Sequence, residues 1–312
     1  MTKKEPGIIN CDIPAITEIQ LAIEEIEKNS FLCEERNFDR RMDAIDFIGF
    51  QVIDQIEALL QTTLQQDELL LLKHRAEKVK AELEEIDTAL FQRLRAEIRT
   101  MGSTGKQFKT MVNEFVDLTL DDNEHQGEPG YDNLDIFING LFSFQTMPEQ
   151  TKDLEQEMVF YQKTPARIVF ELVEKAHLAK DDVFFDLGSG LGQAAILVNL
   201  LAGITAKGVE FEPAFCDYAR ACAAKFNLSN VTFINADARK ADYSEGTIFF
   251  MYTPFKGEML QEVLAVLRKE SLLRKIKIIT YGPCTNEVAL QSWLDFAPLD
   301  NNIYKLCVFS SF

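Results

Sequence analysis

The sequence predicts an α/β fold in which an α-helical N-terminal region precedes a mostly parallel sheet with an antiparallel C-terminal edge. From residue 183 onward, short apolar runs alternate with amphipathic segments, as strands alternate with helices around a parallel sheet. Before that, in residues 13–99, apolar residues recur at the three- and four-residue steps of helices. The 312 residues, 46% of them hydrophobic, suffice for two domains with full cores.

The N-terminal region is predicted to contain three helices, at residues 13–30, 45–64 and 67–99. The second and third segments indicate a helical hairpin, with Asp67 as the N-cap of the longer helix. The heptad spacing is not sustained along that helix. We therefore expect its apolar stripe to pack internally rather than against a coiled-coil partner.

A domain boundary is predicted at residues 121–130, which contain no large apolar residue and several helix breakers. The expected organisation is an acidic helical region at 1–120, a linker with a short helix at 121–157, and an α/β domain at 158–312. We expect the helical region to cap the acceptor pocket of the α/β domain.

The α/β domain begins with an amphipathic helix after Pro165 and then alternates strands and helices. Strands are predicted at 183–187, 205–210, 231–235, 247–252, 276–281 and 303–310, and helices at 193–202, 213–226 and 256–269. A turn-rich joint at 298–302 follows the apolar segment 293–296. This pattern predicts a hairpin, and hence an antiparallel edge on the parallel sheet.

The net charge of −18 is unevenly distributed. Residues 1–150 hold 15 Lys and Arg against 30 Asp and Glu, whereas residues 151–312 hold 17 against 20. An acidic surface repels phosphate backbones, so a nucleic acid substrate is not expected. A basic protein partner and a merely solvated helical surface both fit such acidity.

No apolar run reaches membrane-spanning length, and the first residues lack the apolar core of a signal peptide. We expect a cytoplasmic protein without a membrane segment. The six cysteines form no Cys-x-x-Cys pair, so they are interpreted as reduced thiols, and no metal site is expected. Nothing in the sequence predicts the oligomeric state.

The segment Asp186-Leu187-Gly188-Ser189-Gly190-Leu191-Gly192-Gln193 follows an apolar run and predicts a ligand-binding turn at the end of a buried strand. Glu210 ends the next strand, 22 residues after Gly188. An acid at that position accepts the hydroxyl hydrogens of a ribose. The third glycine of the dinucleotide fingerprint is missing, and Asp186 would repel a pyrophosphate. The pattern favours S-adenosylmethionine (SAM), which carries a sulfonium, an ammonium and a ribose.

Each predicted cofactor residue has an expected role. Gly188 and Gly190 form the turn under the methionine part, and Asp186 faces the ammonium group directly or through water. Asp237, at the end of a third strand, accepts from the adenine amino group, while the small Ala238 leaves room beside the ring. Convergence of three strand-end acids on one ligand is what predicts SAM binding.

The run Asp-Leu-Gly-Ser-Gly-x-Gly-Gln, followed by Gly-Val-Glu, resembles the non-SET histone lysine methyltransferases of the disruptor-of-telomeric-silencing class. The resemblance covers residues 161–268 and implies the Rossmann-like fold of class I SAM-dependent methyltransferases. It also implies that Tyr161 and Thr164 belong to a loop that closes over SAM, although Lys163 stands where that family has Glu. Gln193 matches a glutamine that contacts SAM there.

The resemblance weakens where the chemistry occurs. The family has an asparagine-containing segment after the fourth strand, and this chain has Tyr252-Thr253-Pro254-Phe255. Methyl transfer is an in-line displacement, and we interpret Tyr252 either as the catalytic residue that orients or deprotonates the acceptor, or as strand-end packing.

The methyl acceptor stays open at this point. The resemblance implies a protein lysine, which suits the acidic helical region. The missing asparagine favours a small-molecule N or O acceptor. A third alternative is a non-catalytic SAM-binding protein whose helical part mediates assembly.

Overall fold

The computed structural model describes residues 13–62, 66–101, 105–119, 130–297 and 302–312. The chain divides into two compact units, Met1–Arg93 and Leu94–Phe312, whose boundary falls inside one long helix. The predicted loop at 121–130 lies almost wholly outside the described residues. The predicted domain limits therefore stay a prediction, and each unit is considered by itself.

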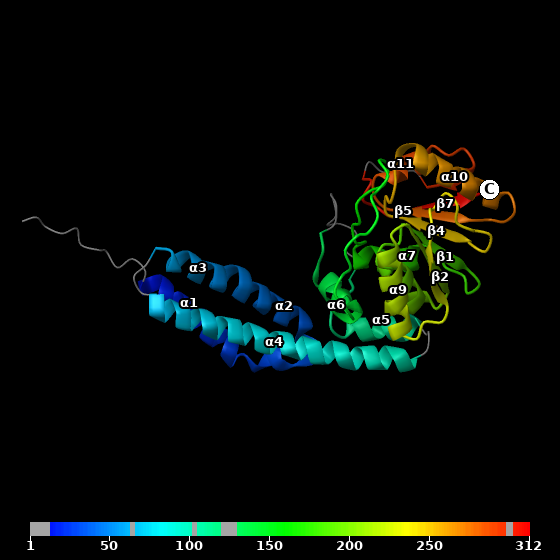
Figure 1. Ribbon diagram of the computed structural model, residues 1–312. Coiled ribbons are helices and arrows are strands. Elements are labelled where there is room, and N and C mark those ends of the chain that lie inside the picture. Colours follow the sequence, from blue (N-terminus) through cyan, green and yellow to red (C-terminus); the bar gives the residue numbers. More distant parts are fainter. Residues whose placement is uncertain (1–12, 63–65, 102–104, 120–129, 298–301) are drawn as a thin grey trace, which may run out of the picture. The chain divides into compact units, whose positions relative to one another are not determined.

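The first unit is helical, as predicted (Figure 1). Its elements are α1 (Ile13–Lys28), two 3₁₀ turns (Ser30–Cys33 and Glu35–Asn37), α2 (Phe38–Phe47), a π-helical turn (Ile48–Ile53), α3 (Asp54–Leu60) and the first part of α4 (Gln66–Met101). The second predicted helix starts earlier than expected, at Phe38. Asp67 lies in the first turn of α4 rather than at its N-cap, because the helix begins at Gln66.

The helices of this unit are held together around Arg41, whose side chain is fully buried. Its guanidinium donates to Asp87 Oδ1 on α4 over 2.8 and 2.6 Å. It also donates to the carbonyls of Leu32 and Glu34 over 2.9 Å each. Arg41 thereby joins α2, the 3₁₀ turns and α4.

The second unit contains one sheet of seven strands in the order β3-β2-β1-β4-β5-β7-β6. The strands are β1 (Val183–Leu187), β2 (Thr205–Glu210), β3 (Val231–Asn235), β4 (Ile248–Met251), β5 (Lys277–Thr280), β6 (Leu294–Phe296) and β7 (Cys307–Ser311). Strands β1 to β5 are parallel, and β7 is antiparallel to both β5 and β6. The predicted fold class is confirmed, with one refinement: the antiparallel strand lies between β5 and β6.

Helices cover both faces of this sheet (Figure 1). They are α5 (Gly105–Asn113), α6 (Asn133–Phe142), α7 (Ala166–Lys175), α8 (Gln193–Ala202), α9 (Pro213–Lys225), α10 (Gly257–Ser271) and α11 (Cys284–Ala289). Parallel crossovers are right-handed, so α8 and α9, which lead toward β3, and α10, which leads toward β5, lie on opposite faces. Within the described residues, no helix combines the length and apolarity that crossing a membrane requires.

The direction of the strand order reverses between β1 and β4, which are neighbours in the sheet. Beneath α10 the sheet buries Phe185, Leu187, Phe249 and Met251 in one apolar core. The carboxyl ends of all five parallel strands meet at one edge. In open α/β sheets, ligands bind at that edge beside the reversal point.

Candidate active site

A cavity opens at the carboxyl ends of the parallel strands. Six of the ten predicted site residues line it: Tyr161, Gly188, Glu210, Asp237, Ala238 and Tyr252. The other four, Thr164, Asp186, Gly190 and Gln193, do not line it. The roles assigned to all ten stay predictions, and their surroundings are described in turn.

The glycine turn is closely packed on its outer side. Gly188 and Gly190 have φ angles of +75° and +51°, which favour glycine. A Cβ on Gly188 would lie 2.3 Å from Cβ of Pro254, and one on Gly190 would lie 2.1 Å from Cε2 of Tyr161. Side chains are therefore excluded at both positions by conformation and by space.

Glu210 points back toward the glycine turn from the end of β2. Its Oε2 accepts from the backbone N–H of Gly190 over 2.7 Å, and its Oε1 accepts from that of Glu212 over 2.8 Å. Each carboxylate oxygen keeps a second lone pair, so two ribose hydroxyls can still be accepted. Burial raises the pKa of Glu210, although the backbone N–H groups of Glu212, Gly190 and Phe211 oppose that shift.

Asp186 is a buried acid near the end of β1. It is 5% exposed. Burial, reinforced by the nearby charge of Glu210, raises its pKa to about 7. A cation bound beside Asp186 would relieve both effects, which fits the predicted role toward an ammonium group.

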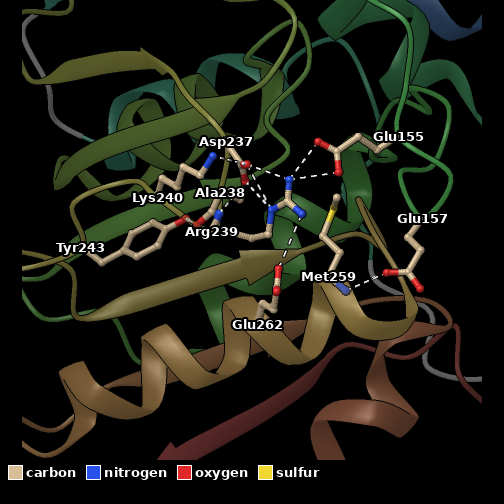
Figure 2. A network of polar contacts seen from close by, with 9 residues as sticks. All are labelled: Glu155, Glu157, Asp237, Ala238, Arg239, Lys240, Tyr243, Met259 and Glu262. Atoms are coloured by element: carbon tan, nitrogen blue, oxygen red, sulfur yellow. Dashed lines mark hydrogen bonds and ion pairs between the residues drawn. The ribbon is translucent and has the colours of Figure 1, made fainter.

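Asp237 and Ala238 follow β3 and are held firmly in place (Figure 2). The carboxylate of Asp237 accepts from Nε of Arg239 over 2.9 and 3.1 Å and from its Nη2 over 2.8 Å. These hydrogen bonds lower the pKa of Asp237, which stays ionised. The carbonyl of Ala238 accepts from the hydroxyl of Tyr243 over 2.7 Å.

One wall of the cavity is formed by residues 150–164, here called the strap, of which the sequence indicated only the end, the loop with Tyr161 and Thr164. At its start, Glu212 accepts from the backbone N–H groups of Thr151 and Lys152 over 2.8 and 2.7 Å. Glu212 also accepts from the hydroxyl of Thr151 over 2.6 Å and caps α9. Although burial opposes it, these bonds lower the pKa of Glu212 to about 2. The signal that could have revealed Glu212 is an acid directly before Pro213, a helix-start pattern.

The middle of the strap is bound to the segment after β4. Glu157 accepts from the backbone N–H of Met259 over 2.7 Å and from that of Glu258 over 3.1 Å, which caps α10. Met158 pairs with Phe255 in an isolated antiparallel bridge. These contacts fix the strap to the part of the cavity where the acceptor is expected.

The end of the strap lies against the glycine turn. Nε2 of Gln193 donates to the carbonyl of Thr164 over 3.3 Å, so these two predicted cofactor residues contact each other. The Tyr161 ring packs on Phe215 with ring centres 5.4 Å apart. Lys163 is turned toward α6, where its Nζ donates to Asn139 over 2.6 Å, and burial lowers its pKa.

The segment after β4 contains backbone strain. Thr253, a β-branched residue, has a φ of +40°, a conformation that costs energy and often marks functional sites. The Tyr252 ring lies 5.1 Å from that of Tyr281, measured between ring centres. The carbonyl of Pro254 accepts from the backbone N–H of Val159 over 3.0 Å, so it is already engaged by the strap.

The charges of the cavity suit a cationic ligand. Glu210, Glu212 and Asp237 line it, and its wall contains no Lys, Arg or His among the described residues. The acids fit the sulfonium and ammonium of SAM and disfavour a pyrophosphate. When bound, SAM would supply the activated methyl group, with its ribose at Glu210, its adenine at Asp237 and Ala238, and its methionine part above Gly188.

A match to a family model points the same way. Residues 150–266 match the family model described as "Histone methylation protein DOT1". This match confirms the predicted resemblance, and with it the predictions of a SAM-dependent methyltransferase and of SAM as its cofactor. No curated protein matches the chain.

Solved structures with similar folds include three methyltransferases. An RNA methyltransferase from Salinibacter ruber in complex with S-adenosyl-L-homocysteine is 23% identical, with 48% of this chain and 92% of that chain covered and a TM-score of 0.40. Precorrin-6y C5,15-methyltransferase from Geobacter metallireducens is 19% identical, covering 50% and 92%, with a TM-score of 0.38. A SAM-dependent methyltransferase from Aquifex aeolicus is 17% identical, covering 47% and 92%, with a TM-score of 0.37.

Proposed function

We propose that this methyltransferase transfers the methyl group of SAM to the side-chain amine of a lysine in a basic protein. The observation that carries the proposal is the wall of the cavity beyond the cofactor residues. Phe160, Tyr252, Phe255 and Tyr304 all line it. Aromatic faces attract an ammonium group, and their low polarity favours its loss of a proton.

The rim of the cavity supports an acceptor that belongs to a large molecule. Phe160 is 80% exposed, although it also lines the cavity. A large apolar side chain in that position gives a protein substrate a surface to contact around the reacting lysine. The family description, which concerns histone methylation, supports a basic protein as the acceptor.

The chemistry requires little from the protein beyond alignment. The amine nitrogen forms a bond to the methyl carbon, the bond from that carbon to sulfur breaks, and the amine loses a proton to water. We assign to the Tyr252 hydroxyl the role of orienting the amine. The carbonyl of Pro254 is engaged by Val159, so alignment of the amine is assigned to other groups of this segment.

The proposal is tested by incubating the protein with methyl-labelled SAM and either core histones or a mixture of small amines and alcohols. Label on histone lysines, located by mass spectrometry and lost with Glu210→Ala, is the expected result. Label confined to the small molecules would replace the proposal by a small-molecule N- or O-methyltransferase, as the missing asparagine suggests. SAM binding without transfer to either set would indicate a non-catalytic SAM-binding protein.

A further inference from the structure

Arg239 lies beside the cofactor cavity without lining it, and it contacts three separate elements (Figure 2). Its guanidinium binds Asp237 after β3, as described above. Its Nη2 also donates to both carboxylate oxygens of Glu155 on the strap, over 2.8 and 3.0 Å. Its Nη1 lies 3.5 Å from the carboxylate of Glu262 on α10.

The number of hydrogen bonds at Asp237 determines what its carboxylate can still accept. Oδ1 accepts from the backbone N–H of Arg239 and from its Nε, both over 2.9 Å. Oδ2 accepts from Nη2 over 2.8 Å and shares Nε over 3.1 Å. A carboxylate oxygen has two lone pairs, so both lone pairs of Oδ1 are engaged, whereas Oδ2 has one close donor and one longer, shared donor, with Nζ of Lys240 3.7 Å away. An adenine amino group would bind Oδ2 in place of the longer, shared contact.

The fork of Arg239 also fixes the orientation of Oδ2. Two or more N–H groups in one plane lock a carboxylate against rotation, which a single ammonium does not. The Asp237 side chain is only 14% exposed, and Arg239 is 23% exposed. The bond to Glu155 is more exposed and contributes less to stability, but it ties the strap to the same guanidinium.

We propose that Arg239 is a positioning residue for the adenine end of the cofactor. It orients the Asp237 carboxylate so that one oxygen accepts from the adenine amino group, and through Glu155 it ties the strap to that contact. This inference rests on the proposed role of Asp237 toward adenine. It assigns to Arg239 a function that a surface ion pair would not have, namely discrimination between purine rings.

The discrimination is measured with two ligands, S-adenosyl-L-homocysteine and its inosine analogue, in which a carbonyl oxygen replaces the adenine amino group. A fixed carboxylate accepts from the amino group but repels the carbonyl. We expect the full-length protein to bind the adenosine compound tenfold or more tightly in calorimetry. Arg239→Met should reduce this preference to less than threefold, and Arg239→Lys should fail to restore it, since a single ammonium lacks the fork.

Two control variants isolate the effect. Arg220→Met removes another partly exposed arginine. Arg220 donates to the carbonyl of Phe233 on β3 and to the carboxylate of Asp217. This variant should leave the preference unchanged. Glu155→Gln leaves the fork on Asp237 intact, so it should keep the preference while accelerating dissociation of the adenosine compound about threefold or more.

The outcomes distinguish the proposed role of Asp237 toward adenine from the proposed role of Arg239 in positioning it. If the wild-type protein binds both compounds equally, Asp237 does not recognise the adenine amino group, and the premise fails. If the wild type discriminates and Arg239→Met discriminates equally well, Asp237 keeps its role and the inference about Arg239 is overturned. A thermal melt of each variant excludes unfolding as the cause of lost binding.

Discussion

At the scale of single residues, Glu210 connects the backbone of the glycine turn to the expected ribose. Replacing Glu210 with Ala would remove the two charge-assisted hydrogen bonds expected to the ribose, each worth about 1.5–3 kcal/mol. We expect SAM affinity to fall tenfold or more in calorimetry. The control is Glu245→Ala. Glu245 is an exposed acid paired with Lys207, which lies on β2 like Glu210, and its removal should leave the affinity unchanged. Equal affinities for the wild type and Glu210→Ala would end the ribose assignment.

Because of Asp186, we expect the affinity for the cofactor to depend on pH. Its pKa of about 7 means that the carboxyl is partly protonated near neutral pH. A cationic ligand binds the ionised form, so binding below pH 7 must release a proton. The α-amino group of the ligand stays protonated below about pH 7.7. Affinity should therefore rise as the pH rises toward 7 and weaken about fivefold from pH 7 to pH 6.

The Asp186 prediction is checked by calorimetry in two buffers of different ionisation enthalpy, which reports the proton released on binding. Asp186→Asn should bind more weakly at pH 7 and lose the pH dependence between pH 6 and 7. A slope that persists in this variant would assign the titration to another group, Glu210 being the nearest.

Tyr252 is the residue on which the chemistry is expected to depend. If its hydroxyl orients or deprotonates the acceptor, Tyr252→Phe should lower turnover about a hundredfold. SAM affinity should stay nearly unchanged, because the hydroxyl acts on the nucleophile. Turnover is measured on the acceptor found with labelled SAM. Weakened SAM binding would instead make Tyr252 part of the cofactor wall, and unchanged turnover would leave positioning to the backbone carbonyls of the segment.

At the scale of elements, the contact between α2 and α4 depends on Arg41. Arg41→Met would leave Asp87 buried without its partner, and burial already raises the pKa of that carboxyl. Removing one member of a buried pair costs about 3–5 kcal/mol. Urea unfolding should show this loss. Arg40→Met is the matched control, because Arg40 is 75% exposed and lies 3.9 Å from Asp43, so its loss should change stability little.

The strap is the element that connects the two ends of the cavity. Glu212 holds its beginning at α9, Glu157 holds its middle at α10, and Gln193 holds its end at α8. None of these contacts is local in sequence. The strap therefore has a fixed place in the fold although it contains no helix and only a single isolated β-bridge.

At the scale of the whole molecule, each of the two compact units has its own buried residues. Heating the full-length protein should give two transitions in differential scanning calorimetry. We expect SAM to bind the α/β unit, so a saturating concentration should raise one transition and leave the other in place. At a hundredfold excess over the Kd, the stabilisation is about 2.7 kcal/mol. Arg41→Met should lower the transition that SAM does not affect. A single transition that shifts both with SAM and with Arg41→Met would mean that the units unfold cooperatively.

The sequence by itself determined the α/β alternation and most element limits. β1, β2 and β3 have the predicted bounds, because their apolar runs end at glycine, acidic or turn residues that stop a strand locally. The last strand was less well predicted: it begins at Cys307 rather than 303, since its length depends on pairing with β5 and β6. The three strand-end acids could be found because parallel strands bring their carboxyl ends to one edge.

Only the tertiary structure decided how those acids are surrounded. Burial raises the pKa of both Asp186 and Glu210, and the charge of Glu210 raises that of Asp186 further, a proximity that their 24-residue separation does not reveal. Arg239 reaches Glu155 across 84 residues, and Glu212 reaches Thr151 across 61. Periodicity reports which face of an element is buried, whereas hydrogen bonds between distant loops form only after the sheet has placed them. The strap and the orientation of Asp237 therefore belong to the tertiary structure.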